Sequence, residues 1–361
     1  MRRRSSILSL SKSQLQALTK VCASGGSDID SALDDATCCY LLAILARDLG
    51  ISKEFPELPA QPDELFSPTP PASMRLEGCE FLTKYERALN KFPDADGYFM
   101  CLAKLHKARL KYSRILEAQP LPTVDQVGPR GLLQYGSLST PSLAALLFWR
   151  KWMFDIDNRA GQETGYLFEP IIAHCIGGVA FGAKNSPIKR LGEKGGGRQV
   201  DCLREEIKTA YEVKVRVTIA ASGQGRWGEE LSFPVEVAAS GYKPILLVLD
   251  PTSNPKLIEL TDAFVEAKGE VFLGDEAWGH LENAAGKVMA TFLDKYVKRP
   301  IADILQSSLD KLPDFTMKYT PRAISLMIGD ETLVIPRREL SSLATEIDVI
   351  PEDSDSGPPL P

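Results

Sequence analysis

The sequence predicts an α/β protein in which a mixed central sheet is flanked by helices and preceded by a helical N-terminal region. Through residues 1–135, apolar side chains recur at spacings of three and four residues, the period of amphipathic helices. From about residue 198, short segments with alternating apolar and polar side chains take turns with helical patterns, as in α/β proteins. With 361 residues, 44% hydrophobic and 25% charged, the chain has a globular composition and room for two or three domains.

The N-terminal region is expected to contain four helices. Their periodic segments are residues 14–21, 29–49, 81–92 and 98–116. Asp28 and Asp30 are expected to cap the second helix, because a short acidic side chain can accept a hydrogen bond from the first helical turn. Residues 55–71 hold six prolines and should form a loop or extended linker between helical layers.

The rest of the chain is expected to form the sheet and the helices around it. Two helical patterns at 141–156 and 161–176 lead to a glycine- and lysine-rich loop at 192–197. Strands follow at 198–203 and 210–217, joined by a short charged turn that predicts an antiparallel pair. Beyond them we expect a helix at 229–239, a strand at 243–250, a helix at 257–268, a strand at 270–273 and a helix at 275–296.

Four regions follow from these patterns. Residues 1–135 are the helical N-terminal region, and residues 136–300 are the α/β core. Residues 301–345 should add a helix and a hairpin of strands 323–328 and 332–335, turning at Gly329 and Asp330. Residues 346–361 carry five acidic side chains and no basic one, so we expect a disordered acidic tail.

Composition also excludes several classes of protein. The longest apolar runs, at 143–149 and 245–249, fall far short of the roughly 20 residues that cross a bilayer, so no membrane role is expected. The seven cysteines include no C-x-x-C pair, which favours neither a disulfide framework nor a zinc site and predicts a reducing, cytoplasmic location. The glycines at 195–197 are not followed by G-K-[ST], so no nucleotide cofactor is expected.

Charge is distributed unevenly along the chain. The formal net charge is −6, yet residues 184–226 hold ten basic side chains against five acidic ones. A local basic segment of this kind favours a polyanionic partner, although a solvated surface would have the same composition.

The chemistry is expected where two strands bring acids together. Alternation places Glu212 and Lys214 on one face of their strand, and Asp201 lies on the strand before it. An antiparallel turn would bring Asp201 and Glu212 to one end of the sheet, where two carboxylates suit Mg²⁺, a cation that keeps several of its waters. The cation could polarise a phosphoryl oxygen and activate water, while Lys214 orients that water or neutralises developing charge. Such a site would hydrolyse phosphodiesters.

An E-x-K sequence on an amphipathic strand is common, so three further features matter. Glu169 lies on an otherwise apolar helix, where an unpaired carboxylate is costly to bury and a metal would be a natural partner; a capping or surface role is the alternative. The helix–strand–strand–helix–strand order can gather these acids at one place. The basic segment surrounds the same place, which would attract a polyanion.

Taken together, these residues resemble the PD-(D/E)XK nuclease superfamily over about residues 160–275. In this resemblance Glu169 is the helix glutamate, Asp201 the motif aspartate, and Glu212 and Lys214 the E-x-K pair. Val200 stands where the motif has its proline. Because the chain has a helical N-terminal region and no helicase motif, it looks like a Type II restriction endonuclease, and within that class it is similar to the ApaLI-like group.

The resemblance implies a restriction-endonuclease-like core and Mg²⁺-dependent cutting of double-stranded DNA at a specific sequence, by a homodimer whose two sites match the two strands. Gln224 and Arg226 could read adenine and guanine in the major groove, or could belong to a polar loop. Phosphate contacts are expected from Lys189, Arg190, Lys194 and Arg198. Two alternatives stay open: a repair or recombination nuclease of the same fold, and a noncatalytic DNA-binding regulator.

Overall fold

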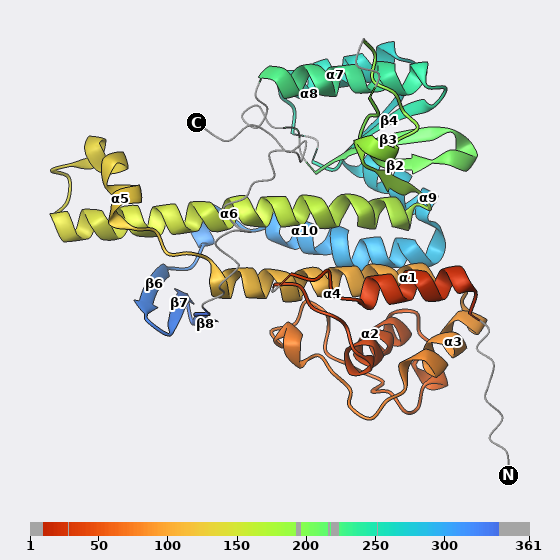
Figure 1. The fold of residues 1–361 in the computed structure, drawn as a ribbon, viewed down its shortest axis with the longest axis horizontal. Helices are drawn as coiled ribbons and strands as arrows, with labels where there is room; N and C mark the ends of the chain where they lie inside the picture. Colours follow the sequence, from red (N-terminus) through yellow and green to blue (C-terminus); the bar gives the residue numbers. More distant parts are fainter. Residues whose placement is uncertain are drawn as a thin grey trace.

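A computed structural model describes residues 10–27, 29–192, 196–215, 217, 224–250 and 252–338. The long helix α6 (Thr140–Cys175) runs through the middle of the molecule (Figure 1). On one side of it lie a five-stranded sheet and helices α7 (Gln224–Ala239) and α8 (Pro255–Glu266). On the other side lie the N-terminal helices, so α6 joins a helical layer to a sheet layer.

The four expected N-terminal helices are present: α1 (Lys12–Cys22), α2 (Asp35–Asp48), α3 (Phe81–Lys91) and α4 (Ala95–Ala118). The capping expectation was wrong for Asp30, because α2 begins later and the side chain of Asp34 accepts the hydrogen bond from the Thr37 backbone at 3.0 Å. Asp28 lies outside the described residues. The proline-rich segment forms loop between the short 3-10 turns η1 (Ser52–Glu54) and η2 (Pro71–Ser73), as expected.

Between α4 and the sheet, a short helical segment precedes the long helix. It comprises α5 (Val124–Val127) and the 3-10 segment η3 (Gly128–Gln134). The expected pair of helices at 141–156 and 161–176 was wrong, because α6 is one helix of 36 residues. Its polar middle stays helical because Glu163 pairs with Arg159 one turn away, at 3.0 Å, and with Lys111 of α4, at 2.8 Å.

The larger sheet has the strand order β1-β2-β3-β4-β5. Strands β1 (Val179–Phe181), β2 (Val200–Arg204) and β3 (Thr209–Lys214) pair antiparallel, whereas β4 (Lys243–Val248) and β5 (Glu270–Leu273) join β3 in parallel. The expected antiparallel pair and the mixed sheet are therefore confirmed. Strand β1, at the sheet edge, was not predicted.

The two faces of this sheet bury different helices. Tyr211 and Val213 belong to the core that α6 and α9 (Asp275–Leu293) cover, whereas Ala210 belongs to the core under α7 and α8. Because side chains alternate along a strand, Glu212 and Lys214 share the face of Ala210 and point toward α7. The hydrophobic pattern of β3 thus decides where its charged residues lie.

The C-terminal elements form a separate small sheet. After α9 come a π-helical segment η6 (Asp294–Lys298), α10 (Arg299–Leu305) and a 3-10 turn η7 (Leu309–Lys311). The antiparallel strands that follow are β6 (Phe315–Thr320), β7 (Ala323–Ile328) and β8 (Glu331–Pro336). The hairpin of β7 and β8 is as expected, while β6 was not predicted.

This small sheet packs on α6. Ile324 and Ile335 form a buried cluster with Trp152 of α6. The expected tail at 346–361 lies outside the described residues. No helix in the described part of the chain is long and apolar enough to cross a membrane.

Candidate active site

Strands β2 and β3 bring two of the expected acids face to face. Their antiparallel register sets Cys202 opposite Tyr211, and one further step of the same register sets Asp201 opposite Glu212. Asp201 is only 8% exposed, and its Oδ2 accepts a hydrogen bond of 2.9 Å from the Val213 backbone. This bond holds the Asp201 carboxylate across the two strands.

Lys214 lies between two carboxylates. Its Nζ is 3.0 Å from Oε1 of Glu212 and 3.4 Å from Oε2 of Glu230 on α7. Burial by itself would lower the pKa of Lys214, but the charges of Glu212, Glu230 and Asp201 outweigh it and raise that pKa. The side chain therefore stays an ammonium ion.

Glu169 lies in the last two turns of α6, next to the same group of charges. Burial raises the pKa of Glu169, the charge of Glu212 raises it further, and Lys214 acts against both. For Asp201 burial is again the largest cause of a raised pKa, followed by the charges of Glu212 and Glu169. The four expected residues thus share one electrostatic environment.

The donor set fits a hard cation with few protein ligands. Within the described residues, no three acidic, histidine or cysteine side chains converge into a ready-made metal cage. The expected set of three metal-binding acids is therefore not preassembled; what the strands provide is the facing pair Asp201 and Glu212. Two carboxylates with open positions for water are the kind of site that Mg²⁺ takes, and a cation would offset both the burial and the repulsion that raise the pKa of Asp201.

The expected DNA-contacting residues are spread over several positions. Lys194 lies outside the described residues, and Gln224 and Arg226 are placed only by their backbone, in the first turn of α7. Lys189 is exposed and donates from Nζ to the Ser186 carbonyl at 3.1 Å. Arg190 forms an ion pair of 3.2 Å with Glu229.

Arg198 has a structural environment instead. It is 8% exposed, donates to the Glu229 carbonyl at 2.5 Å, and lies 3.4 Å from a carboxylate oxygen of Glu236. Its guanidinium also covers the ring of Phe233, at 5.5 Å from the centroid. The expected phosphate contact by Arg198 does not fit this burial; the side chain holds α7 against the segment that leads into β2.

Glu230 is the site residue that the sequence did not reveal. It lies on the helix after the E-x-K strand and reaches back to Lys214. The sequence could have indicated Glu230 only as an acid in the first turns of that helix. The neighbouring Glu229 fits the same description. Only the packing of α7 on the sheet distinguishes the two.

Comparisons with known proteins identify the family of this chain. The family model for ApaLI-like restriction endonucleases matches residues 66–298. The Type II restriction enzyme ApaLI of Acetobacter pasteurianus is 46% identical over 267 residues, which cover 70% of this chain and 71% of that protein. No solved structure matches. With more than half of its length inside the family match, this chain belongs to the ApaLI-like family of Type II restriction endonucleases, which are site-specific deoxyribonucleases.

Proposed function

We propose that this enzyme hydrolyses one phosphodiester in each strand of a short specific DNA sequence, with Mg²⁺ held by Asp201 and Glu212. The observation that carries the proposal is the facing pair of carboxylates across β2 and β3, with an ammonium 3.0 Å from one of them. Asp201 and Glu212 thus offer a site for a cation, and Lys214 offers a positive charge next to it that can interact with a phosphate.

Each residue of the site has a task, and Glu212 takes part in holding both the cation and the ammonium. Bound Mg²⁺ would supply a Lewis acid for the phosphoryl oxygen and a water of lowered pKa. Lys214 would neutralise charge that develops on the phosphate and orient the attacking water. Glu212 and Glu230 hold the ammonium in position, and Glu169 adds a negative charge that strengthens attraction for the cation.

Cutting both strands of a duplex calls for two sites. Because each chain carries one proposed site, two chains are needed. A homodimer whose two-fold axis coincides with that of a palindromic sequence would place one site at each strand. We propose this assembly, acting in the cytoplasm on double-stranded DNA.

Plasmid digestion tests the proposal directly. With Mg²⁺, the purified full chain should convert a supercoiled plasmid into discrete fragments, and sequencing of their ends should give one common sequence. Progressive degradation, or cutting only at branched junctions, would instead indicate a repair or recombination nuclease. Binding without cutting in either Mg²⁺ or Mn²⁺ would contradict a catalytic role altogether.

A further inference from the structure

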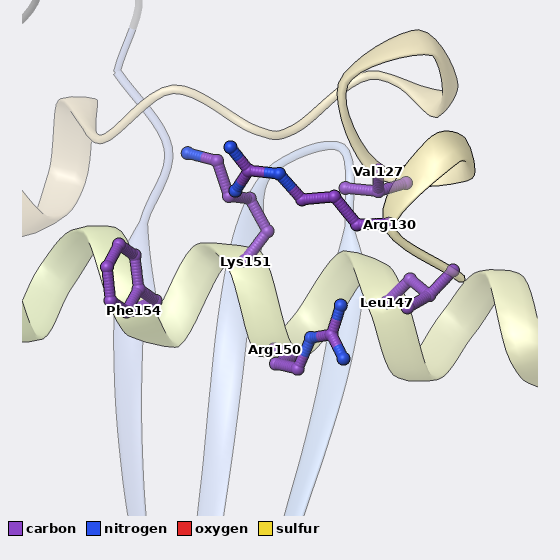
Figure 2. Close-up of a pocket in the computed structure, with 6 residues that line it drawn as sticks. All are labelled: Val127, Arg130, Leu147, Arg150, Lys151 and Phe154. Carbon is purple, nitrogen blue, oxygen red and sulfur yellow. The ribbon is translucent and has the colours of Figure 1, made fainter. Parts of the chain in front are cut away.

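The half of α6 far from Glu169 carries a pocket that the reaction does not use. Its volume is about 170 Å³, and it lies between α6 and the preceding helical segment of α5 and η3 (Figure 2). The lining residues are Val127, Arg130, Leu147, Arg150, Lys151 and Phe154. Three cationic side chains and three apolar ones thus share one small hollow.

Most of the positive charge in this pocket is not neutralised. Arg130 is exposed, and the described residues offer it neither an ion pair nor a hydrogen bond. Arg150 donates to the Gln134 side chain at 3.2 Å, which is neutral, and only Lys151 has an acidic partner, Asp155. An anion with several oxygens could therefore accept from two guanidinium groups, which present planar sets of donors.

The pocket lies on the same face of α6 as the end of the helix that carries Glu169. Lys151 and Glu169 are 18 residues apart, which is five full turns, so both side chains project from the same face of α6. The rise of 1.5 Å per residue puts them about 27 Å apart. Gln162 and Tyr166 lie between them and are exposed, so this face of α6 offers polar contacts along its length.

We propose that the Arg130 pocket binds a phosphate of the DNA backbone about eight base pairs from the cut phosphodiester. The distance follows from about 27 Å along α6 and about 3.4 Å per base pair. The inference rests on the proposed function, because it assumes that the duplex meets Glu169 and runs along this helix. A phosphate contact of this kind strengthens binding and fixes the register without reading sequence.

A second copy of the chain is the competing occupant. Leu132, Leu133 and Tyr135 lie next to the pocket and are strongly exposed, Leu133 to 98%. An exposed apolar patch of this kind is typical of a surface that contacts another protein. The pocket itself, however, presents three cations around a single hollow, and a second copy would have to bury Arg130 and Arg150, for which the described residues offer no acidic partner. The charge of the pocket therefore favours DNA as its occupant over a second copy. The oligomeric state of the variants is measured as a control.

Duplexes with different flanks test the proposal. The probes carry the sequence mapped from the plasmid ends, with flanks of either 4 or 12 base pairs, and kcat/KM in Mg²⁺ is measured for each. The wild type should prefer the long duplex, through KM. Arg130→Ala should reduce this preference about tenfold, the loss expected for one charge-assisted hydrogen bond. It should also reduce the slope of log affinity against log salt by about one.

The matched control removes a charge elsewhere. Lys53 is exposed and lies between α2 and α3, so Lys53→Ala should keep the preference for long flanks. If Arg130→Ala and Arg150→Ala both keep the full preference, the inference is overturned. The inference is also overturned if the two variants change the sedimentation coefficient while the preference for long flanks persists, because the pocket would then be an interface between protein chains. Failure of the wild type to cut any probe would refute the proposed function instead.

Discussion

Two buried carboxylates in this molecule, Asp48 and Asp201, have opposite surroundings. Asp48 ends α2, and its side chain is fully buried. It accepts hydrogen bonds from Tyr98 at 2.9 Å and from Arg47 at 2.8 Å, and it is also paired with Lys295 and Tyr296 of the π-helical segment η6. Burial would raise the pKa of Asp48, but these donors outweigh it and lower that pKa.

Asp201 is buried with much less support. Within the described part of the chain it accepts one hydrogen bond, from the Val213 backbone, and burial, followed by the charges of Glu212 and Glu169, raises its pKa. The protein supplies a full set of donors where a carboxylate only joins helices. Around Asp201, where a cation is expected to enter, Lys214 compensates the negative charge only in part, so the difference separates a structural acid from one that we propose to be functional.

The largest expected effect comes from neutralising the functional acid. Asp201→Asn should reduce DNA cleavage more than a thousandfold, because the metal contributes several kcal/mol of transition-state stabilisation. The melting temperature should not fall, since a repulsive buried charge is removed. Initial rates and thermal denaturation measure the two effects. Glu206→Gln, in the exposed turn after β2, is the matched control and should cut at the wild-type rate.

Removing the ammonium should have a somewhat smaller effect on the same reaction. Lys214→Ala should lower the cleavage rate about a thousandfold at most, the loss expected for one preorganised electrostatic group. Binding of the specific duplex should persist, which a mobility-shift titration would show. Lys243→Ala serves as the control, because Lys243 pairs with Glu270 on the exposed end of β4. Near-normal cutting by Lys214→Ala would remove the lysine from the mechanism.

The structural acid should give the opposite pattern. Asp48→Ala should lower the free energy of unfolding by about 3 kcal/mol, because Arg47 and Lys295 lose the partner that they surround. Denaturant unfolding measures this change. Glu64 is 3.9 Å from Arg47 and 69% exposed in its side chain, so Glu64→Ala should change stability by only about 0.5 kcal/mol. Equal losses from the two variants would show that the buried network does not stabilise α2.

The smallest expected effect concerns pH and the cation. The pKa values of Asp201 and Glu169 are raised in the folded state, so the native protein binds protons more tightly than the unfolded chain between the ordinary carboxyl range and those raised values. Stability should therefore fall as pH rises through that window. Asp48 behaves in the reverse way: its lowered pKa stabilises the fold above the ordinary carboxyl range, and this contribution is lost as pH falls through the lowered value.

Above that window Mg²⁺ should restore part of the lost stability. At ten times its Kd, a ligand of the native state adds about 1.4 kcal/mol. Differential scanning calorimetry of the wild type with and without Mg²⁺ measures this shift, and Asp201→Asn should show almost none. A shift of equal size in Asp201→Asn would place the cation elsewhere.

The local predictions succeeded where periodicity and packing agree. Strands β2, β3, β4 and β5 lie where alternation placed them, because their apolar faces are buried by helices on both sides. The split of α6 was wrong because its middle is polar, and ion pairs to α4 that no local pattern encodes keep it helical. The edge strand β1 was missed because three residues with two exposed side chains carry little signal.

The site divides in the same way. Glu212 and Lys214 share a face because side chains alternate along any strand, so their proximity could be predicted from two sequence positions. Arg198 could not be assigned correctly, because an arginine on a basic segment looks the same whether it meets a phosphate or is buried over Phe233.

The sequence alone determined the order of elements, the alternation that pairs an acid with a lysine on β3, and the acid available on β2. These depend on short-range periodicity, which each segment carries by itself. Only the tertiary structure decided that Asp201 faces Glu212, that Glu230 holds Lys214, and that Arg130 and Arg150 share one pocket. Contacts of that kind join residues that are distant in the chain, and their geometry is fixed by the packing of whole helices on the sheet.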